Sequence, residues 1–184
     1  VELGVEVLTL YAFSRENWQR SSSEVETLIG LLEATIRDET PKLVEQGVQV
    51  RLAGRLSELR AETRASIEQA IAATAGGERM VLNVAFNYSS RTEIVDAVRA
   101  YLDDGNPLAE FDEEGLASYL YTAGLPDPDL LIRTGGDQRI SNFLLWQAAY
   151  AELYFCDCYW PDFGPSELDA AVAEFANRTR RFGR

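Results

Sequence analysis

Residues 127–155 read DPDLLIRTGGDQRISNFLLWQAAYAELYF, and this stretch decides how we interpret the fold. It begins with a short apolar run, Leu130 to Ile132, between a proline and a glycine pair, which predicts a buried strand. Polar side chains follow at once. Open α/β sheets place their ligand sites at the carboxyl ends of their strands. We therefore expect a binding site directly after this strand.

The polar residues after the strand suit a diphosphate. Arg133, Arg139 and Ser141 lie within nine residues of one another, around the pair Gly135 and Gly136. Guanidinium groups bind phosphate oxygens in a fork, and glycine lets backbone N–H groups approach an anion closely. A single arginine in such a place is solvated or paired with an acid about as often as it binds an anion, and that alternative stays open.

One acid, Glu152, lies inside the apolar run that ends the stretch. A carboxylate in such surroundings needs a partner, and a metal ion is one candidate. An acid paired with a basic side chain at the edge of a strand is the more common arrangement. The pattern therefore supports anion binding more strongly than it supports a metal.

Composition excludes several classes of function. The formal net charge of −13 argues against a nucleic-acid-binding surface, and the chain has no histidine and a single lysine, Lys42. Catalysis then depends on carboxylates, amides, arginines, hydroxyls or a metal ion. With no apolar run long enough to span a bilayer, no visible signal peptide and two cysteines expected to be reduced, Cys156 and Cys158, we expect a cytoplasmic protein.

The remaining chain alternates predicted strands and helices. We expect strands within residues 1–13, 48–53, 79–86, 130–132 and 152–156. We expect helices at residues 24–46, 57–75, 92–102, 112–121 and 166–180, with a kink or break at Pro41. This alternation predicts an α/β fold: a single domain with a doubly wound, mostly parallel sheet flanked by helices.

Polar clusters follow three of the expected strands. They occupy residues 14–20, 87–91 and 133–142, and each contains arginine. The carboxyl ends of parallel strands lie at one edge of a sheet, so we expect the three clusters to converge on one cleft.

Four sequence words, YAFSRENW, LNVAFNYSSRTEI, the opening stretch and WPDF, together resemble the undecaprenyl diphosphate synthase family of cis-prenyltransferases. The resemblance covers nearly the whole chain. It implies a homodimeric enzyme with an apolar tunnel that uses Mg²⁺ to condense isopentenyl diphosphate onto an allylic diphosphate such as farnesyl diphosphate. The product would be a cis-polyprenyl diphosphate such as undecaprenyl diphosphate, a lipid carrier for cell-wall synthesis, and it could bring the enzyme into peripheral contact with a membrane.

The resemblance also implies roles for individual residues. It assigns Asn17 to proton removal, and Glu152 to Mg²⁺. It places further residues at the substrates: Ser14, Arg15, Glu16, Trp18 and Arg20 in the first cluster, and Arg133, Arg139, Ile140 and Ser141 at the diphosphate of isopentenyl diphosphate. An amide is a poor base in water, so we expect Asn17 to position the substrate or to relay a proton.

The chain also departs from the family pattern. It has no counterpart of the Asp-Gly-Asn-like loop that carries the family's aspartate for Mg²⁺ and the allylic diphosphate, and we expect the natural chain to contain an N-terminal strand and loop that this sequence lacks. Ser89 and Ser90 replace a Gly-Gly pair, which would change the freedom of that loop. Arg181 and Gly183 match a C-terminal word that in relatives can reach the partner subunit.

Two other functions remain open. A non-catalytic partner subunit of a cis-prenyltransferase would explain the missing aspartate loop. A nucleotide-diphosphate-binding protein outside the family would need a glycine-rich turn after the first strand, and the chain has none there.

Overall fold

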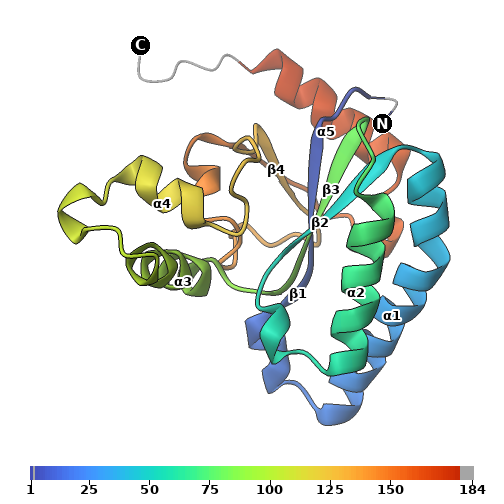
Figure 1. The fold of residues 1–184 in the computed structure, drawn as a ribbon. Coiled ribbons are helices and arrows are strands. Elements are labelled where there is room, and N and C mark those ends of the chain that lie inside the picture. The colour runs from blue at the N-terminus through green and yellow to red at the C-terminus, as the bar shows by residue number, and fades with distance from the viewer. Residues whose placement is uncertain (2, 179–184) are drawn as a thin grey trace. The chain divides into compact units, whose positions relative to one another are not determined.

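Strands and helices alternate along the chain, as the ribbon in Figure 1 shows. The structure, a computed structural model, describes residue 1 and residues 3–178. By its internal contacts the chain divides into two compact units, Val1–Leu125 and Pro126–Arg184. We call them the N-terminal unit and the C-terminal unit. That the chain forms a single domain stays a prediction.

Three parallel strands form the sheet of the N-terminal unit. They are β1 (Val7–Ser14), β2 (Val48–Ala53) and β3 (Met80–Tyr88), in the order β1-β3-β2. Their sequences are rich in β-branched and aromatic residues, which suit a pleated, buried surface. Both outer strands run parallel to β3, so the three carboxyl ends share one edge. The segments that leave the three strands therefore start at the same edge.

Two long helices, α1 (Ser22–Glu45) and α2 (Ala61–Thr74), pack against each other and against β2 (Figure 1). The core beneath them is apolar and includes Phe13, Val25, Ile29, Ile67 and Phe86. Each such side chain contributes roughly 1.5–3 kcal/mol when it is fully buried. The helix α1 continues through its proline at position 41, so the predicted break there is wrong.

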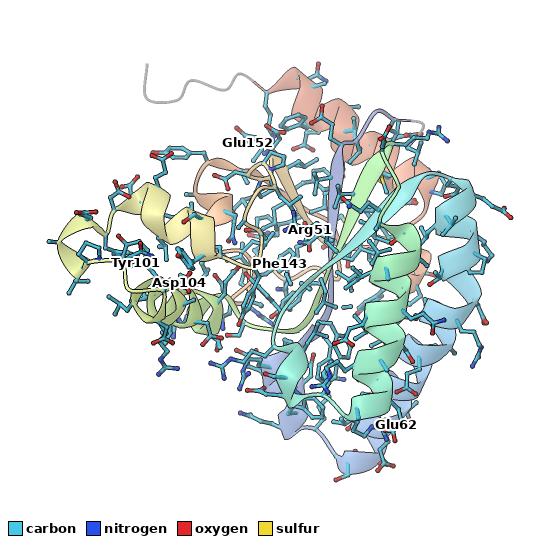
Figure 2. The ribbon with its side chains drawn as sticks, in the orientation of Figure 1. Arg51, Glu62, Tyr101, Asp104, Phe143 and Glu152 are labelled. Carbon is cyan, nitrogen blue, oxygen red and sulfur yellow. The ribbon has the colours of Figure 1, made fainter. Side chains whose placement is uncertain are left out.

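The rest of the N-terminal unit is helical. α3 (Ser90–Asp103) packs against α4 (Glu113–Tyr119), on the other side of the strands in Figure 1. Tyr101, labelled in Figure 2, packs edge-on against Phe111 and Tyr119, and the Tyr119 hydroxyl donates to Asp104, 2.7 Å away. Short 3₁₀ turns complete the unit: η1 (Arg15–Gln19), η2 (Leu56–Glu58) and η3 (Leu108–Glu110).

The C-terminal unit contains a second parallel pair, β4 (Leu130–Arg133) and β5 (Glu152–Phe155). The 3₁₀ turns η4 (Gln147–Tyr150) and η5 (Trp160–Asp162) lie on either side of β5 in the sequence. The last helix, α5 (Pro165–Asn177), begins with a proline at its first position, where no N–H is needed. Glu167 caps it by accepting from the Gly164 N–H, at 2.9 Å.

The predicted fold class is confirmed: parallel strands alternate with flanking helices. The expected strand at residues 48–53 matches β2, and the other strands agree apart from their ends. The helix expected from residue 57 instead opens as the turn η2 and becomes α-helical only at Ala61. The last three residues expected in the final helix are Arg178, which caps α5 in an extended conformation, and residues 179 and 180, which lie outside the described part of the chain.

Gly54 gives a test of how closely the segment after β2 approaches β3. Its φ is +141°, and a Cβ there would lie 1.9 Å from the Phe86 carbonyl oxygen. We expect Gly54→Ala to lower the free energy of unfolding by about 2 kcal/mol or more, because the backbone must move. Urea titrations followed by circular dichroism measure this change.

The matched control is Gly30→Ala, inside α1, where a Cβ meets no atom within 4 Å. The free energy of unfolding of this variant should rise by about 0.5–1 kcal/mol, because alanine favours a helix more than glycine does. Equal stabilities for the two variants would contradict the close approach at Gly54.

Candidate functional site

The first polar cluster forms the turn that follows β1. Within it, the Ser14 backbone N–H donates to Asn17 Oδ1, at 2.8 Å, so the carbonyl end of this amide is bound by its own turn. Among the described residues, Asn17 Nδ2 donates no hydrogen bond. Asn17 is therefore oriented by its turn and keeps N–H donors for a ligand.

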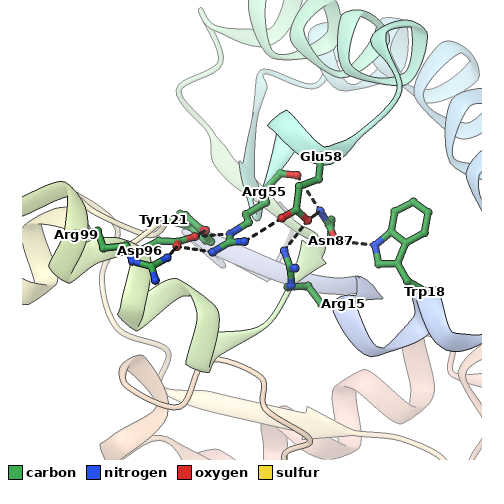
Figure 3. Close-up of polar contacts among 8 residues, drawn as sticks. All are labelled: Arg15, Trp18, Arg55, Glu58, Asn87, Asp96, Arg99 and Tyr121. Carbon is green, nitrogen blue, oxygen red and sulfur yellow. Dashed lines mark hydrogen bonds and ion pairs between the residues drawn. The ribbon is translucent and has the colours of Figure 1, made fainter. Parts of the chain in front are cut away.

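Figure 3 shows how this turn is connected to the other two strand ends. Arg15 Nη1 donates to Glu58 Oε2 at 2.6 Å, and Asn87 Nδ2 donates to the same oxygen at 3.0 Å. Trp18 Nε1 donates to Asn87 Oδ1 at 2.8 Å. The expected meeting of the clusters after β1 and β3 is therefore observed, and Glu58, from the turn after β2, lies between them.

A second acid extends this network. Arg55 forks onto Asp96 of α3 through Nε and Nη2, both at 2.6 Å, and its Nη1 reaches Glu58 Oε1 at 2.9 Å (Figure 3). The Tyr121 hydroxyl also donates to Asp96. The Arg55 fork lowers the pKa of the Asp96 carboxyl, and burial raises that of the Tyr121 hydroxyl. Hydrogen bonds from Arg15, and then from Arg55 and Asn87, lower the pKa of Glu58 to about 2.

The loop after β3 does not need the glycine pair of the family pattern. Ser89 has a φ of −156°, which any residue adopts, and Ser90 is helical and fully buried. The left-handed residue is Asn87, with a φ of 50°, a region that asparagine tolerates better than most residues. The two serines therefore do not strain this loop.

The third polar cluster lies in the C-terminal unit, where it surrounds Arg133. Arg133 Nη1 donates to Ser141 Oγ at 2.7 Å and to the Arg139 carbonyl at 2.8 Å, and Nη2 donates to Asp137 at 2.8 Å. Arg139 donates to the same Asp137 oxygen, at 2.5 Å. The residues predicted to hold a diphosphate thus lie together, with one carboxylate shared by both arginines.

One donor in this cluster lacks an acceptor. Arg133 Nε is buried and has no hydrogen-bond partner among the described residues. A buried N–H without a partner is costly, and a bound oxygen anion would satisfy it. This geometry favours an anion beside Arg133.

The backbone around these arginines is unusual. Ser141, Asn142 and Leu144 have φ values of 48°, 61° and 47°, a left-handed conformation that is rare outside glycine. Such conformations persist only where the surrounding structure enforces them, and they concentrate at ligand sites. The segment after β4 therefore has an enforced backbone conformation of the kind found at ligand sites.

The two glycines of this segment act differently from the prediction. Both have positive φ values, 87° and 78°, so glycine is needed for the turn. Their N–H groups, however, donate to the carbonyls of Cys158, at 2.8 Å, and Cys156, at 3.0 Å. They hold two strand-end segments together, and the expectation that they offer N–H groups to an anion is wrong in this structure.

Glu152, labelled in Figure 2, begins β5 and pairs in register with Leu130. Arg133 ends β4, so three residue steps of about 3.3 Å separate the two along the strands. The Glu152 carboxylate accepts from Arg178 Nη1 at 3.0 Å, the paired arrangement that the sequence left open. In the described range, no three carboxylates or thiols gather as a metal site. The assignment of Glu152 to Mg²⁺ stays a prediction.

Two further predicted residues, Arg20 and Ile140, lie in the first and third polar clusters. Arg20 approaches Glu24 at 3.9 Å as an exposed pair, and the Ile140 carbonyl accepts from the Phe143 N–H. Arg181 and Gly183 lie outside the described residues.

Sequence reasoning missed the turn after β2. Arg55 and Glu58 follow that strand as the other clusters follow theirs, so the rule that gathers strand ends at one edge would have found them.

Comparison with known proteins identifies the family. A family model described as "Putative undecaprenyl diphosphate synthase" matches residues 1–183. The chain belongs to this family. It is 49% identical over 187 residues to the ditrans,polycis-undecaprenyl-diphosphate synthase ((2E,6E)-farnesyl-diphosphate specific) of Pseudomonas aeruginosa, covering all of this chain and 74% of that protein. It is 48% identical to the isoprenyl transferase of Bacillus subtilis, covering 99% of this chain and 72% of the relative.

Two solved structures have the same fold as this chain. A probable undecaprenyl diphosphate synthase from Campylobacter jejuni matches with a TM-score of 0.89 and 34% identity, over 97% of this chain and 84% of that one. Lavandulyl diphosphate synthase from Lavandula x intermedia, in complex with dimethylallyl diphosphate, matches with a TM-score of 0.94 and 35% identity, over 100% and 81%. The fold is therefore that of the family.

The low pKa of Glu58 predicts a dependence of stability on pH. A carboxyl whose pKa falls from 4.5 to about 2 on folding stabilises the chain fully above the higher value and loses this contribution as the pH falls toward the lower one. We expect Glu58→Gln to lower the free energy of unfolding near neutral pH. The difference from the wild type should shrink between about pH 5 and pH 3. Urea titrations across this range measure it, and a difference independent of pH would contradict the prediction.

Proposed function

We propose that the chain is a cis-prenyltransferase that condenses isopentenyl diphosphate onto an allylic diphosphate such as farnesyl diphosphate. The product is a cis-polyprenyl diphosphate such as undecaprenyl diphosphate, and inorganic diphosphate is released at each step. The observation that carries the proposal is the cluster of Arg133, Arg139 and Ser141, built on a left-handed loop in a chain whose whole length matches the family.

In this proposal the cluster holds the diphosphate of isopentenyl diphosphate. The unpartnered Arg133 Nε supplies one donor, and the exposed Arg139 supplies others when it leaves Asp137. Asp137 keeps both guanidinium groups oriented until the anion arrives. Charge-assisted bonds of this kind contribute roughly 1.5–3 kcal/mol each.

Asn17 handles the proton that leaves isopentenyl diphosphate. Its carbonyl is bound by the Ser14 N–H, which leaves its Nδ2 as the group that donates to the substrate in this proposal. A neutral amide is a poor base, so Asn17 positions the reacting group while the proton passes to a diphosphate oxygen or to water.

We include Mg²⁺ in the proposal, with Glu152 as one ligand. Mg²⁺ is commonly bound by one or two carboxylates together with substrate phosphates, so a single protein carboxylate is compatible with it. Glu152 must then exchange Arg178 for the ion. The ion would neutralise charge that develops on the leaving diphosphate.

The finer features of the proposal rest on the family. They are a homodimer, a cytoplasmic location, contact with a membrane through the lipid product, and an apolar tunnel for the growing chain. At about 0.8 kcal/mol per buried CH₂, each isoprene unit in such a tunnel contributes roughly 3–4 kcal/mol, which makes release of a long product slow. Among the described residues, no helix has the length and apolar character needed to cross a membrane.

Incorporation of labelled isopentenyl diphosphate into solvent-extractable polyprenyl product tests the proposal. The assay contains farnesyl diphosphate and Mg²⁺, and it compares the 184-residue chain with the product of the gene that encodes it. Elongation by either polypeptide supports the enzyme. If neither elongates the primer, the assignments of Asn17 and Glu152 fail and the non-catalytic partner subunit takes their place.

Arg139→Ala tests the diphosphate cluster. We expect it to raise KM for isopentenyl diphosphate by about tenfold or more, because one charge-assisted contact is lost. Steady-state kinetics measure this, with Arg37→Ala as the control. Arg37 is exposed on α1 and bonds to the neighbouring Asp38, so its loss should leave KM unchanged. Similar KM values for the two variants would contradict the assignment.

A further inference from the structure

Two polar contacts hold the turn that carries Asn17, one on each side of that residue. Arg15 precedes Asn17 and binds Glu58, and Trp18 follows it and binds Asn87 (Figure 3). The two holding groups are themselves joined, because Asn87 Nδ2 donates to the Glu58 oxygen that Arg15 contacts. A single carboxylate and amide pair thus binds both sides of the turn.

Glu58 and Asn87, which hold the turn, are themselves fixed by further contacts. The other oxygen of Glu58 accepts from Arg55, which is fixed in turn by its fork onto Asp96. Asn87 is 1% exposed, and its Nδ2 also donates to the Arg55 carbonyl at 2.9 Å. Neither group can turn away without breaking several bonds.

Burial in the core contributes little to the position of the turn. None of the residues in η1 is buried, so core packing does not set its position. The Trp18 ring meets Phe13 edge-on, with ring centres 5.3 Å apart, but the Trp18 side chain remains partly exposed. Polar contacts therefore determine most of the orientation of this turn.

We propose that Glu58 and Asn87 are positioning residues that set the orientation of Asn17 by holding Arg15 and Trp18. The role in catalysis rests on the proposed function, while the hold on the turn does not. Small displacements of a reacting group can reduce a rate strongly, so a group that touches no substrate can still control turnover.

Hydrogen exchange of backbone amides in residues 14–20 tests the hold without any need for activity. We expect Glu58→Gln and Trp18→Phe to speed exchange there by about tenfold, because the first removes the carboxylate charge that Arg15 binds and the second removes the hydrogen bond from Trp18 to Asn87. The matched control is Glu39→Gln, which removes an exposed ion pair with Lys42 on α1. It should leave exchange in the turn unchanged.

Two results would overturn the proposal. In the first, the backbone amides of residues 14–20 exchange at the same rate in Glu58→Gln as in Glu39→Gln. In the second, exchange rises equally throughout the N-terminal unit, which would mean that Glu58 supports the unit as a whole and does not hold the turn.

Kinetics extend the test to catalysis. We expect Glu58→Gln to lower kcat about tenfold and to leave KM for isopentenyl diphosphate within about twofold, since Arg133 and Arg139 set that affinity. Combined with Arg15→Ala, it should lower kcat by less than the product of the two separate effects, because part of its effect passes through Arg15. Effects that multiply would overturn this route. If the wild-type chain makes no product, the proposed function fails, and the exchange experiment still decides whether the turn is held.

Discussion

The parallel pairing of β1 and β2 on either side of β3 is the constraint on which the N-terminal unit depends. Because the three strands run the same way, the segments that leave them start at one edge of the sheet. Arg15 and Trp18, on either side of Asn17, are far from Glu58 and Asn87 in the sequence and contact them only through this pairing. The apolar core under α1 and α2 keeps the strands in place, so the polar network needs only to orient the side chains.

Much of this arrangement is predictable from the sequence. Apolar runs bounded by glycine or proline locate the strands, and helical spacing locates the helices between them. The cluster around Arg133 is also predictable, because its arginines and serine follow a short buried strand. The long words shared with the undecaprenyl diphosphate synthase family identify the chain more specifically than any of these patterns.

The remaining features depend on tertiary contacts that no local pattern encodes. Arg55 and Glu58 follow β2, so the strand-end rule locates them, but their partners Asp96 and Asn87 come from the approach of α3 and β3. The glycine N–H groups after β4 are taken by the Cys156 and Cys158 carbonyls, which lie twenty or more residues further along the chain. The pairing of Glu152 with Arg178 likewise joins β5 to the residue that caps α5. The local sequence indicates which chemical groups are present, whereas the fold determines which of these groups contact each other.

The geometry of the double bonds in the product tests the central claim most directly. Farnesyl diphosphate would be elongated with ¹³C-labelled isopentenyl diphosphate, and the polyprenyl product would be examined by NMR. A cis-prenyltransferase must give the Z geometry at every newly formed double bond. New double bonds of E geometry, or a primer that is never elongated, would contradict the assignment.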